Sequence, residues 1–128
     1  MAQSEFVLAG KRCLVLDDEL LIAVDIQQIL EAAGASVVCV GSAEDALAAL
    51  RSGPRFDIAV LDIVLGGAAN NSLRVIAALT AQKTPFVFLT GMRRIDVDNA
   101  AYPKAPVVEK PYQPPLLIDA MLRAMAAR

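Results

Sequence analysis

The sequence predicts an α/β domain in which a doubly wound, five-stranded parallel sheet carries helices on both faces. Short apolar runs alternate along the chain with amphipathic stretches at helical spacing. The short runs are apolar throughout, as is typical of strands buried on both faces of a parallel sheet. The chain has 128 residues, 56% of them hydrophobic and 20% charged, which suits one domain with one buried core. Five such strands favour the flavodoxin-like order 2-1-3-4-5.

Each predicted strand is too short for a helix and is followed by polar or turn residues. The five expected strands are Cys13–Leu16, Ser36–Val40, Asp57–Leu61, Phe86–Leu89 and Val107–Val108. We expect residues 1–128 to form a single domain with its core at about 10–127, no linker and no output domain.

The stretches between the strands carry helix start and stop signals. The first helix is expected from Leu20 to Ala33, where Gly34 stops it, and the second begins at the cap residue Ser42. Further helices are expected from a cap at Asn71 or Ser72 to Ala81, and after Pro114–Pro115 with an apolar face from Leu116 to Met125. Between residues 92 and 105 the polar sequence and its prolines leave room for only a short helix.

Composition excludes several classes of function. The chain has no histidine, which removes histidine-based nucleophile relays, histidine acid–base catalysis and most zinc sites. A net charge of −2 and a pI near 5.0 disfavour direct nucleic-acid binding. No apolar run approaches the length of a membrane span, and the first residues lack the basic start of a signal peptide. We therefore expect a cytoplasmic protein that contacts neither nucleic acid nor membrane.

The two cysteines, Cys13 and Cys39, are too far apart for a CxxC metal or redox motif. Both lie in predicted strands, where a free cysteine behaves as a small apolar residue. We expect them to be reduced, although a bridge between adjacent strands is an alternative.

Polar side chains interrupt the apolar pattern where the predicted strands end. Asp17 and Asp18 follow the first strand, Asp62 the third, Thr90 the fourth and Lys110 the fifth. Because ligands of open parallel sheets bind beyond the carboxyl ends of the strands, we expect these residues to converge on one pocket. Taken singly, each has an ordinary explanation as a helix cap, a turn residue or a solvated charge. Together they indicate a site.

The chemistry of this set favours phosphoryl transfer. Three carboxylates at one sheet edge repel one another, and Mg²⁺ relieves such repulsion while accepting carboxylate and phosphate oxygens. Lys110 and Thr90 supply an ammonium and a hydroxyl for an anionic phosphoryl group. Asp62 is then the candidate nucleophile, which would form an aspartyl phosphate.

From about residue 10 to 127, the chain resembles the receiver domains of two-component response regulators. The resemblance is carried, in order, by the stretches LVLDDE at 14–19, DIAVLD at 57–62, FVFLTG at 86–91 and EKP at 109–111. It implies a signalling switch rather than an enzyme, with a histidine kinase or histidine phosphotransfer protein as phosphodonor. Output would be protein–protein interaction with an unknown downstream protein, or phosphoryl relay or storage.

The resemblance also assigns roles. Asp62 would be the phosphoacceptor, and Mg²⁺ would be ligated by Asp18, by Asp62 and by the backbone carbonyl of Val64, with Asp17 acting mainly through water. Thr90 would be the switch hydroxyl, and Lys110, followed by a cis peptide bond to Pro111, would pair with the phosphoryl oxygens. Exposed residues of the segment 91–105, which would repack on phosphorylation, could form a partner face. The candidates are Arg93, Arg94, Tyr102 and Lys104.

Some positions depart from the family pattern. The loop after Asp62 reads IVLGG at 63–67 and lacks the usual proline, and Val107 stands where a switch tyrosine or phenylalanine is usual. The stretch 85–91 is similar to the FAT GUY subgroup of stand-alone receivers, except that Leu89 replaces its alanine and Met92 replaces an aromatic residue.

Three other classes of protein share parts of this pattern. A pseudo-receiver would fold alike and bind partners without being phosphorylated, but the intact acceptor, hydroxyl and lysine positions argue against it. A haloacid-dehalogenase-type phosphatase needs an Asp-x-Asp motif after the first strand, whereas Asp17 and Asp18 are adjacent. A flavodoxin-like FMN carrier needs a hydroxyl-rich phosphate loop where this chain has acids.

Overall fold

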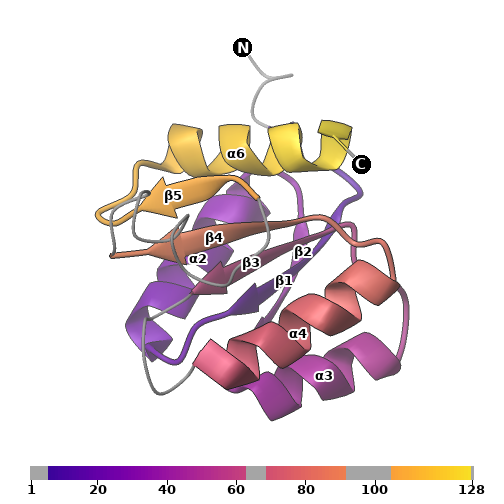
Figure 1. Cartoon of the computed structure of the whole chain (residues 1–128). Helices are drawn as coiled ribbons and strands as arrows, with labels where there is room; N and C mark the ends of the chain where they lie inside the picture. The colour runs from indigo at the N-terminus through magenta and orange to yellow at the C-terminus, as the bar shows by residue number, and fades with distance from the viewer. Residues whose placement is uncertain (1–5, 63–68, 92–104, 128) are drawn as a thin grey trace.

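A computed structural model of the chain describes residues 6–62, 69–91 and 105–127 (Figure 1). Its strands are β1 (Arg12–Leu16), β2 (Ser36–Val40), β3 (Ile58–Asp62), β4 (Phe86–Thr90) and β5 (Val107–Glu109). Its helices are α2 (Leu20–Ala32), α3 (Ala43–Arg51), α4 (Ala69–Ala81) and α6 (Pro114–Ala127). The strands form one parallel sheet in the order β2-β1-β3-β4-β5, which confirms the predicted fold class and strand order.

The sheet has a separate apolar core on each face, because successive side chains of a strand point to opposite faces. On β1, Cys13 and Val15 belong to one core, whereas Leu14 and Leu16 belong to the other. Helices α2 and α6 cover the first face, and α3 and α4 cover the second (Figure 1). This two-sided burial is why the strands are apolar at every position rather than at alternate ones.

Two of the predicted helix signals, the cap at Ser42 and the stop at Gly34, are confirmed by the structure. The Ser42 hydroxyl accepts a hydrogen bond of 3.1 Å from the backbone N–H of Asp45 and so caps α3. Gly34 follows α2 with a φ of +99°, and a β-carbon there would lie 3.0 Å from the backbone of Ala9. Both the conformation and the close approach require glycine at this position.

Helix α4 begins at Ala69, before the cap expected at Asn71 or Ser72. Alanine is the strongest helix former, so Ala69 extends the helix beyond the polar residues that usually begin one. The side chains of residues 69–72 and the short helix expected within residues 92–105 lie outside the described residues, apart from Ala105.

The chain preceding β1 contributes a core residue that the sequence analysis did not single out. Leu8 is fully buried in the same core as Leu30 of α2 and Ala124 of α6. Its backbone N–H donates a hydrogen bond of 2.9 Å to the carbonyl of Ala33. The packed domain therefore begins slightly before the expected start at about residue 10.

Both cysteines are free thiols, as their spacing and their positions in the strands predicted. Burial raises the pKa of Cys13 to about 12, which keeps this thiol protonated. Cys39 is half-buried, and its thiol donates toward the Ala23 carbonyl at 3.5 Å and the Gln27 side chain at 3.4 Å. The alternative of a bridge between β1 and β2 is therefore wrong for this structure.

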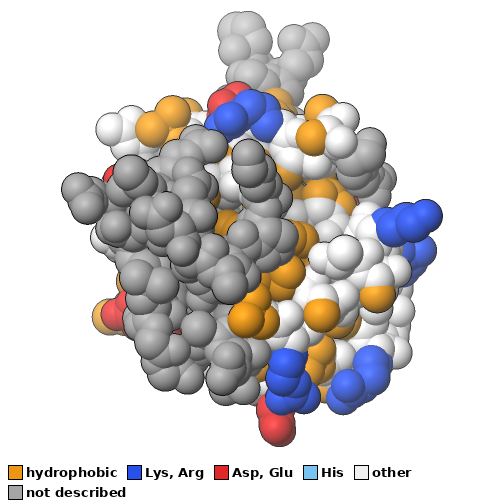
Figure 2. All heavy atoms as spheres, viewed as in Figure 1, with side chains coloured by type: hydrophobic (Ala, Val, Ile, Leu, Met, Phe, Trp, Pro, Cys, Tyr) orange, Lys and Arg blue, Asp and Glu red, His pale blue; other side chains and the backbone are white. Residues whose placement is uncertain are grey.

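The described surface shows no concentration of positive charge in the view of Figure 2, where Lys and Arg side chains lie scattered around the edges. Within residues 6–62, 69–91 and 105–127, no helix combines the length and apolar character needed to cross a membrane.

Candidate functional site

The structure brings charged residues from three strand ends to one edge of the sheet. Asp17 directly follows β1, Asp62 ends β3, and Lys110 directly follows β5. One carboxylate oxygen from each of Asp17, Asp18 and Asp62 lies within 4.8 Å of the other two. The Lys110 ammonium Nζ lies 3.0 Å from Asp62 Oδ1. The parallel order of the strands produces this convergence, because all their carboxyl ends meet at one edge.

Asp17 is held in place by its own loop. Its backbone N–H donates a hydrogen bond of 3.1 Å to the Val40 carbonyl, which continues the β1–β2 pairing by one residue. Its Oδ1 accepts a hydrogen bond of 2.8 Å from the backbone N–H of Glu19. Asp17 is only 3% exposed, and its Oδ2 is buried with no hydrogen-bond partner among the described residues. Burying a carboxylate oxygen without a partner costs free energy. A cation bound to this oxygen would offset that cost.

Lys110 balances part of the negative charge. Its side chain is 21% exposed and that of Asp62 is 6% exposed, so their ion pair is largely shielded from water. A second carboxylate, that of Glu19, lies 3.8 Å from the same ammonium. The backbone N–H of Lys110 donates a hydrogen bond of 2.7 Å to the Thr90 carbonyl, which fixes the start of the lysine side chain beside β4.

Thr90 is fully buried at the end of β4, where it pairs with Glu109 of β5. In the pair of β3 and β4, Asp62 is opposite Leu89, and Thr90 is the next residue after Leu89. Val107, where the family usually has an aromatic switch residue, pairs with Phe88 and is half-buried. The peptide bond between Lys110 and Pro111 is cis, as the resemblance implied.

The acids titrate in an unusual range because they are buried together. Burial raises the pKa of Asp17 to about 6, the Glu19 N–H opposes this shift, and the charge of Asp62 adds to it. Burial also raises the pKa of Asp62, although the hydrogen bond and charge of Lys110 act against the rise. Partial burial alone would lower the pKa of Lys110, but its contact with Asp62 outweighs this and raises it.

These residues fit a hard divalent cation. The oxygens of the three carboxylates approach within 4.8 Å, and opposite ligands of Mg²⁺ lie about 4.2 Å apart in an octahedral site. In the described part of the chain, Lys110 alone forms ion pairs with this cluster, so three negative charges face one positive charge. A divalent cation would balance the excess and would use the buried Asp17 Oδ2.

Several sequence-based predictions concern residues that lie outside the described ranges. Among them are the backbone carbonyl of Val64 as a Mg²⁺ ligand and the repacking of the segment 91–105 beyond Gly91. The predicted partner face lies there too, at Arg93, Arg94, Tyr102 and Lys104.

Sequence reasoning missed two features of the site. Glu19 lies 3.8 Å from the Lys110 ammonium, and its place directly after the two aspartates was the signal that could have marked it. Sequence reasoning also missed the hydrogen bond between Tyr112 and Asp25, for which a separation of 87 residues gives no local signal.

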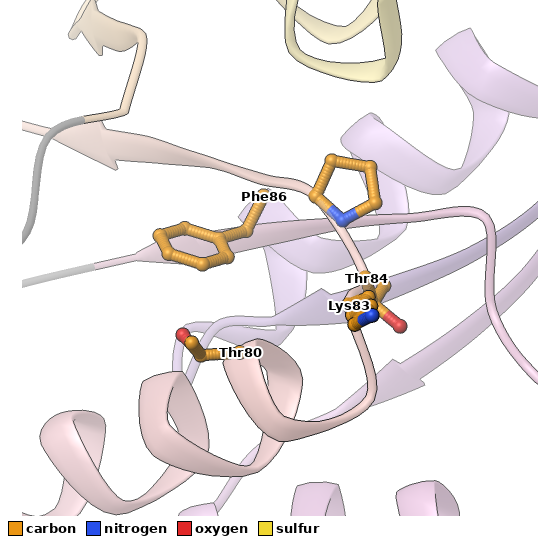
Figure 3. Close-up of a pocket in the computed structure, with 5 residues that line it drawn as sticks. Thr80, Lys83, Thr84 and Phe86 are labelled. Carbon is orange, nitrogen blue, oxygen red and sulfur yellow. The ribbon is translucent and has the colours of Figure 1, made fainter. Parts of the chain in front are cut away.

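A separate hollow of about 580 Å³ lies at the other end of the sheet. It is lined by Thr80, Lys83, Thr84, Pro85 and Phe86, and Figure 3 shows these side chains at the junction of α4 and β4. Phe86 begins β4 and Thr90 ends it, so this hollow is a full strand length away from the acidic cluster. We therefore locate the chemistry at the cluster and not in the hollow.

Comparisons with known proteins bear on the fold of the chain. No protein-family model and no curated protein matches the sequence, but many solved structures match the fold. A response regulator receiver protein from Sinorhizobium medicae WSM419 is 25% identical with a TM-score of 0.72, covering 94% of this chain and 98% of that one. The response regulator TrrA from Thermotoga maritima, solved with Mg²⁺ and BeF, is 25% identical with a TM-score of 0.73. The match covers 89% of this chain and 98% of TrrA.

The response regulator PhyR from Brucella abortus is 25% identical with a TM-score of 0.79, and the match covers 98% of this chain and 51% of PhyR. The chain therefore has the fold of the receiver domains of response regulators, which are components of two-component signal transduction. These neighbours are named as response regulators, which are signalling proteins rather than classical enzymes. Membership of the FAT GUY subgroup stays a prediction.

Proposed function

We propose that this protein is a phosphorylation-dependent signalling switch in which Asp62 accepts a phosphoryl group in a Mg²⁺-dependent reaction. The observation that carries the proposal is the position of the Lys110 ammonium, 3.0 Å from an Asp62 carboxylate that two further carboxylates approach within 4.8 Å. This arrangement supports the proposal because it would bring an acceptor, a cation site and an ammonium for the transferred oxygens together. The phosphodonor would be a histidine kinase or a histidine phosphotransfer protein.

In the proposed reaction, a free oxygen of the Asp62 carboxylate attacks phosphorus. The new O–P bond forms as the bond from phosphorus to the donor nitrogen breaks, and the electron pair leaves with the donor. The contact with Lys110 favours the ionised form of Asp62, which is the form that attacks. Lys110 and the Thr90 hydroxyl would then bind the phosphoryl oxygens.

Asp17, Asp18 and Asp62, with the Val64 carbonyl, would hold Mg²⁺, which would neutralise the charge of the acids and of the incoming phosphoryl group. Asp17 contributes the buried oxygen that lacks a partner in the described residues, and Asp18 contributes an exposed carboxylate. The added charge of about −1.5 to −2 at the sheet edge would then be read by a downstream protein or passed on in a relay.

The alternative is a pseudo-receiver that binds a partner without phosphorylation, and one experiment separates the two. Purified protein is incubated with acetyl phosphate with and without Mg²⁺, and its intact mass is measured. The proposal predicts one added phosphoryl group that requires Mg²⁺, is lost in Asp62→Asn and is retained in Asp119→Asn, a control on the exposed face of α6. Failure of acetyl phosphate and of a phosphohistidine donor alike would favour the pseudo-receiver. Steady release of phosphate from general phosphoesters would indicate a phosphatase instead.

A further inference from the structure

A hydrogen bond outside the acidic cluster joins the turn after β5 to helix α2. The Tyr112 hydroxyl donates to Asp25 Oδ2 over 2.5 Å, from the turn between β5 and α6 to the first half of α2. Tyr112 follows Lys110 by two residues, and α2 starts directly after the acidic run that ends at Glu19. The bond therefore connects the segment that carries the lysine with the helix that follows the acids.

The tyrosine ring strengthens this connection. Tyr112 is half-buried and packs against the apolar core between the sheet and helices α2 and α6. Burial and the nearby Asp25 raise the pKa of Tyr112, so its hydroxyl stays protonated and remains a donor. The ring thus anchors the turn on the core, and the hydroxyl ties it to α2.

Lys110 lies between two attachment points. On one side, its backbone N–H donates to the Thr90 carbonyl at 2.7 Å, and on the other, Tyr112 is tied to α2. The lysine side chain itself is long and flexible, and two carboxylates, of Asp62 at 3.0 Å and Glu19 at 3.8 Å, compete for its ammonium. A firmly held backbone reduces the range of positions that the ammonium can reach.

We propose that Tyr112 is a positioning residue, which acts through its hydrogen bond to Asp25 to hold the Lys110 ammonium on the Asp62 side of the site. This inference rests on the proposed function for its effect on phosphorylation, but the placement of the lysine is independent of it. Without the bond, the turn loosens, and the ammonium is shared more evenly with Glu19. Phosphoryl transfer then slows because the Lys110 ammonium is no longer held where it stabilises the charge of the transition state.

The test uses three single variants, the double variant Tyr112→Phe/Asp25→Ala and one control variant. Tyr112→Phe removes the hydroxyl but keeps the ring, Asp25→Ala removes the acceptor, and Asp25→Asn keeps an oxygen that accepts the bond. The rate of phosphorylation by acetyl phosphate is measured at saturating Mg²⁺ by intact mass, and Mg²⁺ affinity is measured by calorimetry. Asp119→Ala breaks an ion pair of 3.1 Å with Arg123 on α6 and serves as the matched control for a lost exposed contact.

We expect Tyr112→Phe and Asp25→Ala each to lower the maximal rate on the order of tenfold, with Mg²⁺ affinity unchanged. The maximal rate of the double variant should be no lower than that of either single variant. Asp25→Asn should retain most of the rate, and Asp119→Ala should have the wild-type rate. The proposal would be overturned if the loss of rate in the double variant were the product of the two single losses. It would also be overturned if Asp25→Asn were as slow as Asp25→Ala. Thermal unfolding of each variant identifies any that has simply lost its fold.

A second readout does not depend on phosphorylation. In metal-free protein, the NMR signals of the Lys110 ammonium and its adjacent methylene, assigned with Lys110→Arg, report the position of the side chain. They should shift in Tyr112→Phe and Asp25→Ala and keep their wild-type values in Asp25→Asn. If wild type is not phosphorylated but these shifts occur, the proposed function fails and the positioning role stands. Identical lysine signals in all variants would refute the positioning role whatever the phosphorylation result.

Discussion

Lys110 and Asp62 come from the ends of different strands and meet with 3.0 Å between Nζ and Oδ1. The pair lies beside Asp17 and Asp18, so one ammonium faces three carboxylates and the cluster keeps an excess of two negative charges. Packing of the sheet enforces this arrangement, because β1 and β3 are hydrogen-bonded neighbours and β5 is next to β4. Stability, metal binding and phosphoryl transfer should therefore all respond to the charges of these residues.

Replacing Lys110 with methionine tests the role of the ammonium. Lys110→Met keeps most of the side-chain length but removes the charge, so we expect the rate of phosphorylation by acetyl phosphate to fall roughly 10²-fold. Lys83→Met, an exposed lysine at the other end of the sheet, is the control and should keep the wild-type rate. Equal rates in Lys110→Met and wild type would show that the ammonium does not contact the transferred group.

Replacing Asp17 with asparagine tests the repulsion within the cluster. Asparagine still accepts the hydrogen bond from the Glu19 N–H but removes one of three like charges. We expect the metal-free variant to gain about 1 kcal/mol, or about 4 °C in Tm, and to lose the stabilisation that Mg²⁺ gives to wild type. Thermal unfolding in EDTA and in Mg²⁺ measures both effects. A metal-free variant less stable than wild type would mean that repulsion is not the dominant interaction there.

The pKa of Asp17, raised to about 6, predicts a pH dependence of stability. The folded protein binds this proton more tightly than the unfolded chain, so metal-free stability should fall as pH rises from about 4 to about 6. Asp62, whose pKa is raised as well, acts in the same direction. Urea midpoints across this range should fall in wild type and fall less steeply in Asp17→Asn. Rising stability of wild type, and parallel curves for the two proteins, would contradict the assignment.

Leu8 should be as important for stability as a residue inside the sheet. It is fully buried before the first strand, so Leu8→Ala should cost about 2–5 kcal/mol in the free energy of unfolding. The neighbouring Val7 is 38% exposed, and Val7→Ala should cost much less. Chemical denaturation of both variants measures the difference, and similar small losses would show that the segment before β1 does not pack in solution.

Much of the fold could be predicted because each strand carries its own signal. The apolar runs around Val15 and Val60 are short and uninterrupted, which a parallel sheet requires, and turn residues such as Gly34 mark the ends of helices. The convergence of Asp17, Asp62 and Lys110 followed from the same pattern, because the carboxyl ends of all strands of a parallel sheet lie at one edge.

What could not be predicted depends on packing between distant segments. Leu8 lies in a stretch with no periodic pattern, and only the tertiary structure shows that it enters the core beneath α2 and α6. The contact between Tyr112 and Asp25 joins residues 87 positions apart, and neither residue type by itself predicts a partner. The early start of α4 at Ala69 reflects helix propensity that outweighed the nearby capping residues.

The measurement that tests the central claim most directly is the identity of the residue that carries the phosphoryl group. Protein treated with acetyl phosphate and Mg²⁺ is reduced with borohydride, which converts an aspartyl phosphate to homoserine, and its peptides are sequenced by mass spectrometry. We predict homoserine at position 62 and at no other aspartate, with no conversion when Mg²⁺ is omitted. Conversion at another aspartate, or a stable phosphate on a hydroxyl residue with position 62 unchanged, would contradict the account.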